Sequence, residues 1–348
     1  MDFFHDVAKE QEVPTRQAFT AARKKVSYHA FKDFFEKSCE LVVSNPSPKL
    51  HNGYHILAID GTSFIVGDHK KLSSYFGETT TVEGRAMCRL SAVVDVLDGS
   101  IASGEVAPFS EGERSLALKQ VKALKVVPNA LYLFDRGYWS HELISEIINN
   151  GQSFLMRIPS RNKQSSVVDS TGQTIELRRL SCTLTSGEEE ILVTNLPKES
   201  LTDEEIFALY PYRWGAETKY LELKSRLQID KFSCTSVNEV LQDIYCTLYI
   251  SNLVAFVCEA SDEEIESKTA IKANKYKQKT NRSVCIATLR KRFTSLYYLD
   301  DPRKLQKRLD IFYRDLSRCV IYENKSKPKP RNKRKIKAAR AHRSPILL

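Results

Sequence analysis

The sequence lacks the paired cysteines and spaced histidines that hold zinc in proteins. Its 348 residues include eight cysteines, and no two of them form a Cys-x-x-Cys pair. His51 and His55 stand four residues apart, but His55 opens a strand-like apolar run, which excludes a helical pair of ligands. Several cysteines, such as Cys246, lie in apolar runs. We therefore exclude a zinc site and predict reduced cysteines that pack as small apolar side chains.

A secretion signal and an uninterrupted apolar segment are also missing. The first residues, MDFFHDVAKEQ, contain acidic side chains and no apolar core of the kind that signal peptides carry. The most apolar stretch, residues 240–257, contains Asp243 and Asn252 and has polar flanks. This pattern favours a buried helix over a membrane span. We expect a soluble cytoplasmic protein with no membrane partner.

Acidic residues are absent from residues 325–348, which contain ten Lys and Arg residues. The net charge of the chain is +10, and without this tail 43 basic residues balance 43 acidic ones. Such a segment, which includes Lys333, Arg334 and Lys335, cannot bury a core and is predicted to be disordered. Its expected partner is a nucleic acid backbone, through counterion release. The alternative is a solubilising end with no specific partner.

Two short apolar runs that end in aspartate predict neighbouring strands of a sheet. One run, residues 55–60, ends in Asp60, and the other, residues 130–135, ends in Asp135. Asp98-Gly99 between two alternating segments predicts a hairpin. Helical patterns separate the later strands, and this order predicts an α/β sheet. In such sheets, ligand-binding groups gather at the carboxyl ends of strands, where we expect both aspartates.

The pattern changes after the predicted sheet. Residues 160–197 are rich in Ser, Thr and Val with turn signals, which predicts a small β-rich insertion. Thr202 and Glu205 form a capping box, and Pro211 should restart the helix that follows. We expect six segments: N-terminal helices (1–52), the first part of the core (53–158), the insertion (159–199), the second part of the core with the helix of Glu217 (200–260), C-terminal helices (261–323) and the basic tail (324–348).

Four polar or charged side chains follow this insertion at a spacing that places them on one face of a helix. Tyr210, Arg213, Glu217 and Lys224 have offsets of 0, 3, 7 and 14 residues. On one helix these offsets fall within an arc of about 60°. A carboxylate flanked by two cations and a tyrosine suits a metal-assisted reaction on phosphate. The alternative is a solvent-exposed face with charge pairs worth about 0.2–0.5 kcal/mol each.

Asp60, Asp135 and Glu217 can converge if the two strands are parallel neighbours and the helix packs beside them. Three carboxylates at one place repel one another unless a cation supplies counter-charge. Hard oxygen ligands without His or Cys favour Mg²⁺ or Mn²⁺, and two such ions can drive an in-line phosphoryl displacement. Arg213, Lys224 and Tyr210 would then hold phosphates. Taken singly, each aspartate could be an ordinary turn residue at a strand end.

Other residues near these motifs are assigned lesser roles. Asp95 lies within a strand and is predicted to be structural, and Asp68 and Glu113 are candidate supporting groups. Trp139 and Trp214 could stack on a base, but a role in the core is the favoured interpretation for both.

Together these residues resemble the DDE transposases of bacterial insertion sequences, specifically the insertion sequence 4 family. The signature Tyr-x2-Arg-x3-Glu-x6-Lys matches at Tyr210, Arg213, Glu217 and Lys224, and the segments AIDGTSF and LFDRGYWS resemble the contexts of the two aspartates. The resemblance covers roughly residues 12–290. It implies a ribonuclease H-like fold with a β-rich insertion between the second Asp and the Glu.

The resemblance also implies cut-and-paste transposition in the bacterial cytoplasm, with metal-dependent nicking at element ends and strand transfer into target DNA. Asp60, Asp135 and Glu217 would bind two Mg²⁺ or Mn²⁺ ions, and Tyr210, Arg213 and Lys224 would contact DNA phosphates. The partners would be double-stranded DNA, as inverted repeats and target, and a second copy of the chain in a synaptic dimer.

The chain departs from the family pattern in two places. Its N-terminal segment is shorter than the DNA-binding region that members usually carry, so residues 1–52 could be a remnant of it. Ala216 stands where a branched aliphatic residue is common. Two other functions therefore stay open: an inactive element that only binds DNA, and a stand-alone metal-dependent nuclease of the same fold.

Overall fold

The computed structural model describes residues 15–78, 85–184, 187–232, 234–269, 276–297 and 299–322. The chain divides into two compact units. The larger unit is Arg23–Ala255, and the smaller combines Met1–Ala22 with Phe256–Leu348. The predicted basic tail, with Lys333, Arg334 and Lys335, lies outside the described residues.

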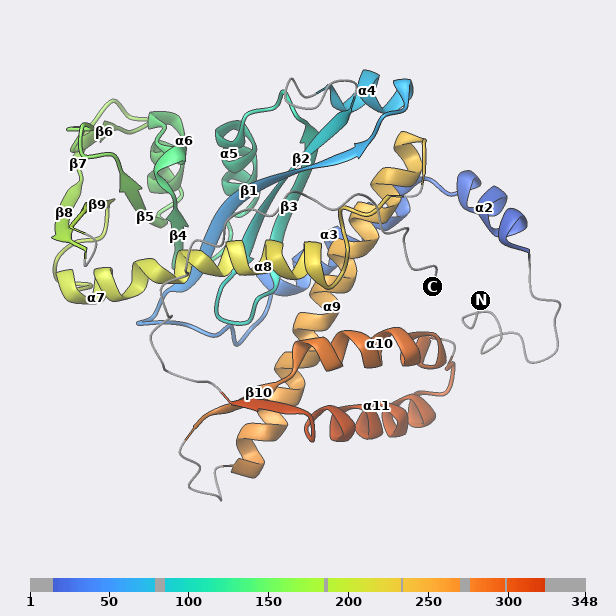
Figure 1. The fold of residues 1–348 in the computed structure, drawn as a ribbon. Helices are drawn as coiled ribbons and strands as arrows, with labels where there is room; N and C mark the ends of the chain where they lie inside the picture. Colours follow the sequence, from blue (N-terminus) through green and yellow to red (C-terminus); the bar gives the residue numbers. More distant parts are fainter. Residues whose placement is uncertain are drawn as a thin grey trace. The chain divides into compact units, whose positions relative to one another are not determined.

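The larger unit is built on a mixed seven-stranded sheet with the order β3-β2-β1-β4-β5-β9-β8 (Figure 1). In this sheet β4 pairs in parallel with β1 on one side and with β5 on the other, and every other pairing is antiparallel. The strands are β1 (His55–Gly67), β2 (Ala86–Asp95), β3 (Ile101–Pro108), β4 (Ala130–Phe134), β5 (Ser153–Ile158), β8 (Arg178–Thr183) and β9 (Glu189–Thr194). The predicted α/β sheet is confirmed.

Local sequence explains the centre of this sheet. All five residues of β4, Ala130–Phe134, are buried, as expected for an unbroken apolar run in a central parallel strand. Gly99 has φ +77°, a conformation that glycine adopts without strain, and it closes the predicted hairpin between β2 and β3. The crossover from β3 to β4 is helix α5 (Glu113–Ala123), and that from β4 to β5 is α6 (His141–Asn149).

The β-rich segment after β5 contributes to two sheets. Strands β6 (Ser166–Val168) and β7 (Thr174–Glu176) form a separate two-stranded antiparallel sheet. Strands β8 and β9 instead extend the main sheet, because β9 pairs antiparallel with β5. The second half of this segment therefore belongs to the central sheet.

Helical structure resumes after β9, as predicted. Thr202 and Glu205 form the capping box at the start of α7 (Asp203–Leu209). A 3-10 turn, η2 (Tyr210–Arg213), contains Pro211, and α8 (Trp214–Ser225) follows it and packs against β1 and β2 (Figure 1). Pro211 thus restarts the helix, since it cannot donate a backbone hydrogen bond.

The predicted apolar helix is α9 (Val237–Thr269). By length and composition α9 alone among the described helices is apolar enough to cross a membrane, but 56% of its most apolar window is buried inside the protein. Asn252, a buried residue of this helix, donates to the Ile101 carbonyl at 3.0 Å and accepts from the Ile101 N–H at 2.7 Å. These contacts join α9 to the edge strand β3, as expected for a helix that packs in the protein core.

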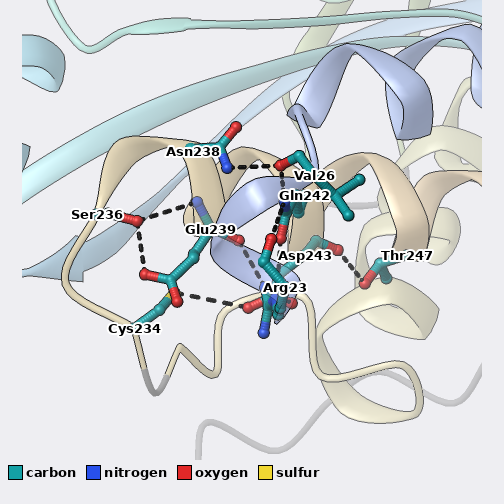
Figure 2. Close-up of polar contacts among 9 residues, drawn as sticks. All are labelled: Arg23, Val26, Cys234, Ser236, Asn238, Glu239, Gln242, Asp243 and Thr247. Atoms are coloured by element: carbon teal, nitrogen blue, oxygen red, sulfur yellow. Dashed lines mark hydrogen bonds and ion pairs between the residues drawn. The ribbon is translucent and has the colours of Figure 1, made fainter. Parts of the chain in front are cut away.

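The start of α9 holds the turn between helices α2 (Arg16–Lys25) and α3 (Tyr28–Val43) (Figure 2). The Arg23 guanidinium donates to Gln242 Oε1 at 2.8 Å and to Asp243 Oδ1 at 2.6 Å. Gln242 and Asn238 donate to the Val26 carbonyl at 2.6 and 2.9 Å. This polar clamp satisfies the backbone groups that the turn leaves without helical partners.

The smaller unit contains residues 256–269 of α9, a short antiparallel pair β10 (Gln278–Thr280) and β11 (Val320–Tyr322), and helices α10 (Arg282–Tyr297) and α11 (Pro302–Leu316). Phe312 and Leu316 bury the apolar side of α11, and Arg292 pairs with Asp315 at 2.8 Å. The eight cysteines, all within the described residues, form no disulfide, and four of them are buried.

Candidate active site

Asp60 and Asp135 lie at the same level of two neighbouring parallel strands. The parallel pairing of β1 with β4 ends at Ala58 and Leu133, and each aspartate follows two residues later. Since side chains alternate along a strand, both should point to one face of the sheet. The prediction of parallel neighbours is confirmed. The prediction that Asp60 ends its strand is wrong, because β1 continues to Gly67 in antiparallel pairing with β2.

The Asp60 carboxylate is partly buried and accepts the Gly61 N–H at 2.9 Å. Burial raises the pKa of Asp60 to about 6. The negative charges of Glu217 and Glu113 also raise this pKa, whereas the Gly61 N–H and Arg213 lower it. Asp60 therefore lies among other charged groups, and its ionised form is only partly compensated by them.

Asp135 caps the short 3-10 helix η1 (Arg136–Tyr138) by accepting the Arg136 N–H at 2.7 Å. The alternative interpretation of Asp135, as an ordinary turn residue at a strand end, therefore also holds, because the same carboxylate caps the local turn. Tyr138, at the end of η1, is 2% exposed, and its hydroxyl has no hydrogen-bond partner among the described residues. Burial raises the pKa of Tyr138, and the charges of Asp60, Glu113 and Asp135 raise it further, whereas Arg89 lowers it.

Arg213 is a buried cation that binds Glu217 and acts electrostatically on Asp60 and Asp135. Its guanidinium donates to Glu217 Oε1 at 2.8 Å, and its side chain is 8% exposed against 44% for Glu217. Burial lowers the pKa of Arg213, but the Glu217 hydrogen bond and the charges of Tyr210, Asp135 and Glu217 outweigh it, so the pKa is raised. Arg213 also lowers the pKa of Asp60. One buried cation thus interacts with all three carboxylates, which a solvent-exposed row of charge pairs does not explain.

The four signature side chains do not share one regular α-helix. Tyr210 and Arg213 belong to the 3-10 turn η2, and only Glu217 and Lys224 lie on α8. The expected arc of about 60° assumed 3.6 residues per turn throughout, whereas a 3-10 turn has about three. The structure nevertheless brings Tyr210, Arg213 and Glu217 to the same strands.

Two tyrosines tie the Glu217 segment to the two strands. Tyr210, 5% exposed, donates to the Phe134 carbonyl at 3.2 Å, directly before Asp135. Tyr220, 6% exposed, donates to the Asp60 carbonyl at 2.6 Å. Sequence reasoning missed Tyr220, although its position three residues after Glu217 was an available signal. These bonds fix the backbone of both aspartates relative to α8.

Lys224 lies over the continuation of β1. Its ammonium donates to Thr62 Oγ1 at 2.6 Å and to the Ser63 carbonyl at 3.5 Å. An ammonium has three N–H donors, so a phosphate contact is compatible with these bonds. The predicted DNA contacts of Tyr210, Arg213 and Lys224 stay predictions.

The residues that were predicted to have lesser roles occupy different environments. Asp95 is buried and pairs with His55 Nε2 at 2.5 Å, which is a structural position as predicted. Asp68 is exposed after the end of β1. A core role is wrong for Trp214, which is 59% exposed with the Arg213 guanidinium 5.6 Å from its ring centroid. Glu113 lies against Gly61, beside Asp60.

The donor chemistry of the site suits a hard divalent cation, since Asp60, Asp135 and Glu217 offer only carboxylate oxygens. In the part of the chain that the structure describes, no three His, Cys, Asp or Glu side chains are gathered closely enough to hold a metal ion. Glu217 is directed to Arg213 instead. The carboxylates therefore fit such an ion in chemical type and are not gathered around one place in this conformation, where Arg213 supplies the positive charge.

Comparison with known proteins agrees with this geometry. The sequence matches the transposase DDE domain over residues 51–253, which is more than half of the chain. The fold resembles that of the piggyBac transposase in a cryo-electron microscopy structure of a synaptic complex with hairpin DNA. The TM-score is 0.50 at 11% identity, over 89% of this chain and 67% of that one. No curated protein matches the sequence.

At 11% identity the structural likeness shows the fold alone, and it agrees with the mixed seven-stranded sheet of a ribonuclease H-like core. The sequence match spans β1, β4 and α8, and so includes all three candidate carboxylates. The chain belongs to the transposase DDE domain family.

Proposed function

We propose that this protein is a cut-and-paste transposase of the insertion sequence 4 family, which cleaves DNA at the ends of its element and joins them to target DNA. The arrangement of Arg213 supports this proposal most directly. This buried cation interacts with Asp60, Asp135 and Glu217, residues that are 75 or more positions apart in the sequence. A structural ion pair needs one carboxylate for its cation. Three carboxylates that interact with one cation instead suit a site that binds cations.

Asp60, Asp135 and Glu217 would hold Mg²⁺ or Mn²⁺, with two ions per site. Such ions, when bound, activate an attacking hydroxyl and stabilise the leaving oxygen of a phosphodiester. The two strands fix the positions of Asp60 and Asp135, whereas Glu217 is on the exposed side of α8 and is 44% exposed. We assign these three residues as the catalytic carboxylates.

The cations of the site would hold the DNA. Arg213 presents a planar guanidinium that can bind a phosphate through two parallel hydrogen bonds once Glu217 turns to a metal ion. Lys224 and Tyr210 would contact phosphates beside the cleaved bond. Trp214 is exposed next to Arg213, where stacking on an unpaired base is chemically possible.

The proposed partner is double-stranded DNA, as the element's inverted repeats and as target. The piggyBac transposase with the similar fold is described in a synaptic complex with hairpin DNA. We propose a homodimer on paired ends in the bacterial cytoplasm, with the basic tail, including Lys333, Arg334 and Lys335, adding contacts to the DNA backbone.

Cleavage of the element's own ends with Mg²⁺ tests the proposal. Glu217→Gln should abolish cleavage and retain DNA binding in a mobility-shift assay, because the change removes charge at nearly constant volume. Glu204→Gln is the matched control, since Glu204 is an exposed glutamate on the neighbouring helix α7, and it should cleave like the parent. Equal cleavage by Glu217→Gln and the parent would remove Glu217 from the catalytic assignment.

The same assay separates the other two functions. A parent protein that binds the ends but never cuts them is an inactive DNA-binding element. A parent protein that cuts DNA without regard to element ends, and gives no joined product, is a stand-alone nuclease.

A further inference from the structure

Glu113, the first residue of α5, lies beside the aspartate of β1. A Cβ atom built on Gly61 would lie 3.0 Å from both Cδ and Cγ of Glu113 and 3.1 Å from its Oε1. Such distances are too short for ordinary carbon contacts, so glycine at position 61 is what allows the carboxyl group this approach. The Glu113 carboxyl therefore packs on the backbone directly after Asp60.

The first turn of α5 is also tied to the segment of the second aspartate. Arg114 Nε donates to the Gly137 carbonyl at 2.8 Å, two residues after Asp135. Leu116 and Ala117, in the next turn, are fully buried and anchor the helix on the sheet. The start of α5 thus touches the chain next to both aspartates, and this fixes the position of Glu113.

Glu113 has no partner that accounts for its position. Its side chain is half-buried, and within the described residues it makes no ion pair and no hydrogen bond. Its charge instead raises the pKa values of Asp60 and Tyr138, after the larger effect of burial on each. Arg213 lowers the pKa of Asp60 and Arg89 lowers that of Tyr138, yet both pKa values remain raised, so the positive charge present offsets burial and the carboxylates only in part.

The Tyr138 hydroxyl is an independent sign that a ligand belongs here. The residue is 2% exposed, and its hydroxyl lacks a partner among the described residues. Besides burial, the charges of Asp60, Glu113 and Asp135 raise its pKa and the charge of Arg89 lowers it, so the hydroxyl is within electrostatic reach of all three carboxylates. A buried hydroxyl without a partner destabilises the folded protein. Water bound to a cation at this place would donate a hydrogen bond to the hydroxyl oxygen and supply the missing partner.

We propose that Glu113 is a fourth carboxylate of the divalent cation site, acting with Asp60 and Asp135 directly or through one bound water. This inference rests on the proposed function, since it assigns a further ligand to the same site. It also gives Gly61 a role, because a Cβ atom at this position would displace the Glu113 carboxyl that packs on it.

Calorimetric titration of Mn²⁺ into the full-length protein tests this assignment without DNA and without turnover. Glu113→Gln keeps the size of the side chain and should weaken Mn²⁺ binding by about 10-fold or more, in the range found for groups that support metal ligands. Glu142→Gln is the matched control, because Glu142 occupies the first turn of α6 with a side chain 72% exposed. It should bind Mn²⁺ like the parent.

Two further variants complete the design. Gly61→Ala keeps every carboxylate and should weaken Mn²⁺ binding as well, because the added methyl displaces Glu113. Asp60→Asn reports on the proposed function itself. If Asp60→Asn loses Mn²⁺ binding while Glu113→Gln binds like Glu142→Gln, the fourth carboxylate is refuted and the proposed site stands.

If neither Asp60→Asn nor Glu113→Gln changes Mn²⁺ binding, the proposed cation site and the fourth carboxylate are both refuted. Loss of Mn²⁺ binding in Glu113→Gln alone would place Glu113 in a separate site and would also overturn the inference. Circular dichroism of each variant identifies unfolding. A Glu113→Gln variant that unfolds is replaced by Glu113→Asp, which keeps the charge but shortens its reach and should give a smaller loss of affinity.

Discussion

Removing one buried hydroxyl should separate the Glu217 helix from the strand of Asp60. Tyr220→Phe deletes the donor that bonds to the Asp60 carbonyl at 2.6 Å and leaves the ring in place. The residue is 6% exposed, so water replaces the lost bond poorly. A net hydrogen bond of this kind contributes about 1–1.5 kcal/mol, which corresponds to a loss of about 2–6 °C in melting temperature for a unit of this size.

The same change should slow DNA cleavage more than it weakens DNA binding. Cleavage requires the Asp60 carboxylate to keep its position relative to that of Asp135. A displacement of about 1 Å at a catalytic group can lower a reaction rate by about 100-fold. We expect a partial displacement and about a 10-fold slower cleavage of end DNA. Tyr210→Phe, which removes the bond to the Phe134 carbonyl, should have a similar effect on stability.

Urea unfolding and single-turnover cleavage measure the two effects separately. Tyr212→Phe is the matched control, since Tyr212 lies in the same segment but is 38% exposed. It should unfold and cleave like the parent. If Tyr220→Phe matches this control in both assays, the hydroxyl does not position Asp60 and the tie between α8 and β1 is wrong.

Three further outcomes follow from the structure. The pKa of Asp60 is raised from 3.8 to about 6, so the folded protein favours the protonated carboxyl. In EDTA, the contribution of Asp60 to the free energy of unfolding should be full below about pH 4 and should be lost as the pH rises through about 6. Urea unfolding of Asp60→Asn should show no such loss. Arg23→Met should lower stability by about 2 kcal/mol, because Asp243 and Gln242 lose their guanidinium partner, and an unchanged urea midpoint would refute the clamp. Deletion of residues 325–348 should weaken DNA binding and flatten its salt dependence, as measured by fluorescence anisotropy between 50 and about 200 mM salt.

Sequence patterns predicted the sheet well because its central strands carry unbroken apolar runs. The run at Ala130–Phe134 became a fully buried strand, and Asp98-Gly99 became the expected hairpin. The length of β1 was not predictable in the same way. Residues after Asp60 include Gly61 and Thr62, which are typical of a turn, and only the antiparallel pairing with β2 keeps them extended.

The candidate site was predictable in its residue types and less so in its contacts. The spacing of Tyr210, Arg213 and Glu217 indicated one face, but a sequence does not reveal the 3-10 turn that moves two of them out of helical phase. It also does not show which charges are buried. Lys219 and Glu222, polar residues of α8, are both buried and pair at 2.9 Å, with Ser251 of α9 bonded to the same ammonium.

The roles of residues that only folding brings close to Asp60 were the hardest to predict. Tyr220 and Glu113 lie outside the signature, and each is connected to Asp60 by folding rather than by spacing. Trp214 was expected in the core, yet its ring is exposed and lies 5.6 Å from the Arg213 guanidinium. Exposure of an aromatic ring beside a phosphate-binding candidate agrees with a site for DNA.

The most direct test of the account is one reaction that contains the purified protein, a labelled DNA end of its element, a target plasmid and Mg²⁺. The account predicts nicking at the boundary of the element, followed by joining of that end to the plasmid, with neither product formed by Asp135→Asn. Joined products from Asp135→Asn at the rate of the parent, or cutting by the parent that ignores the boundary and yields no joined product, would contradict it.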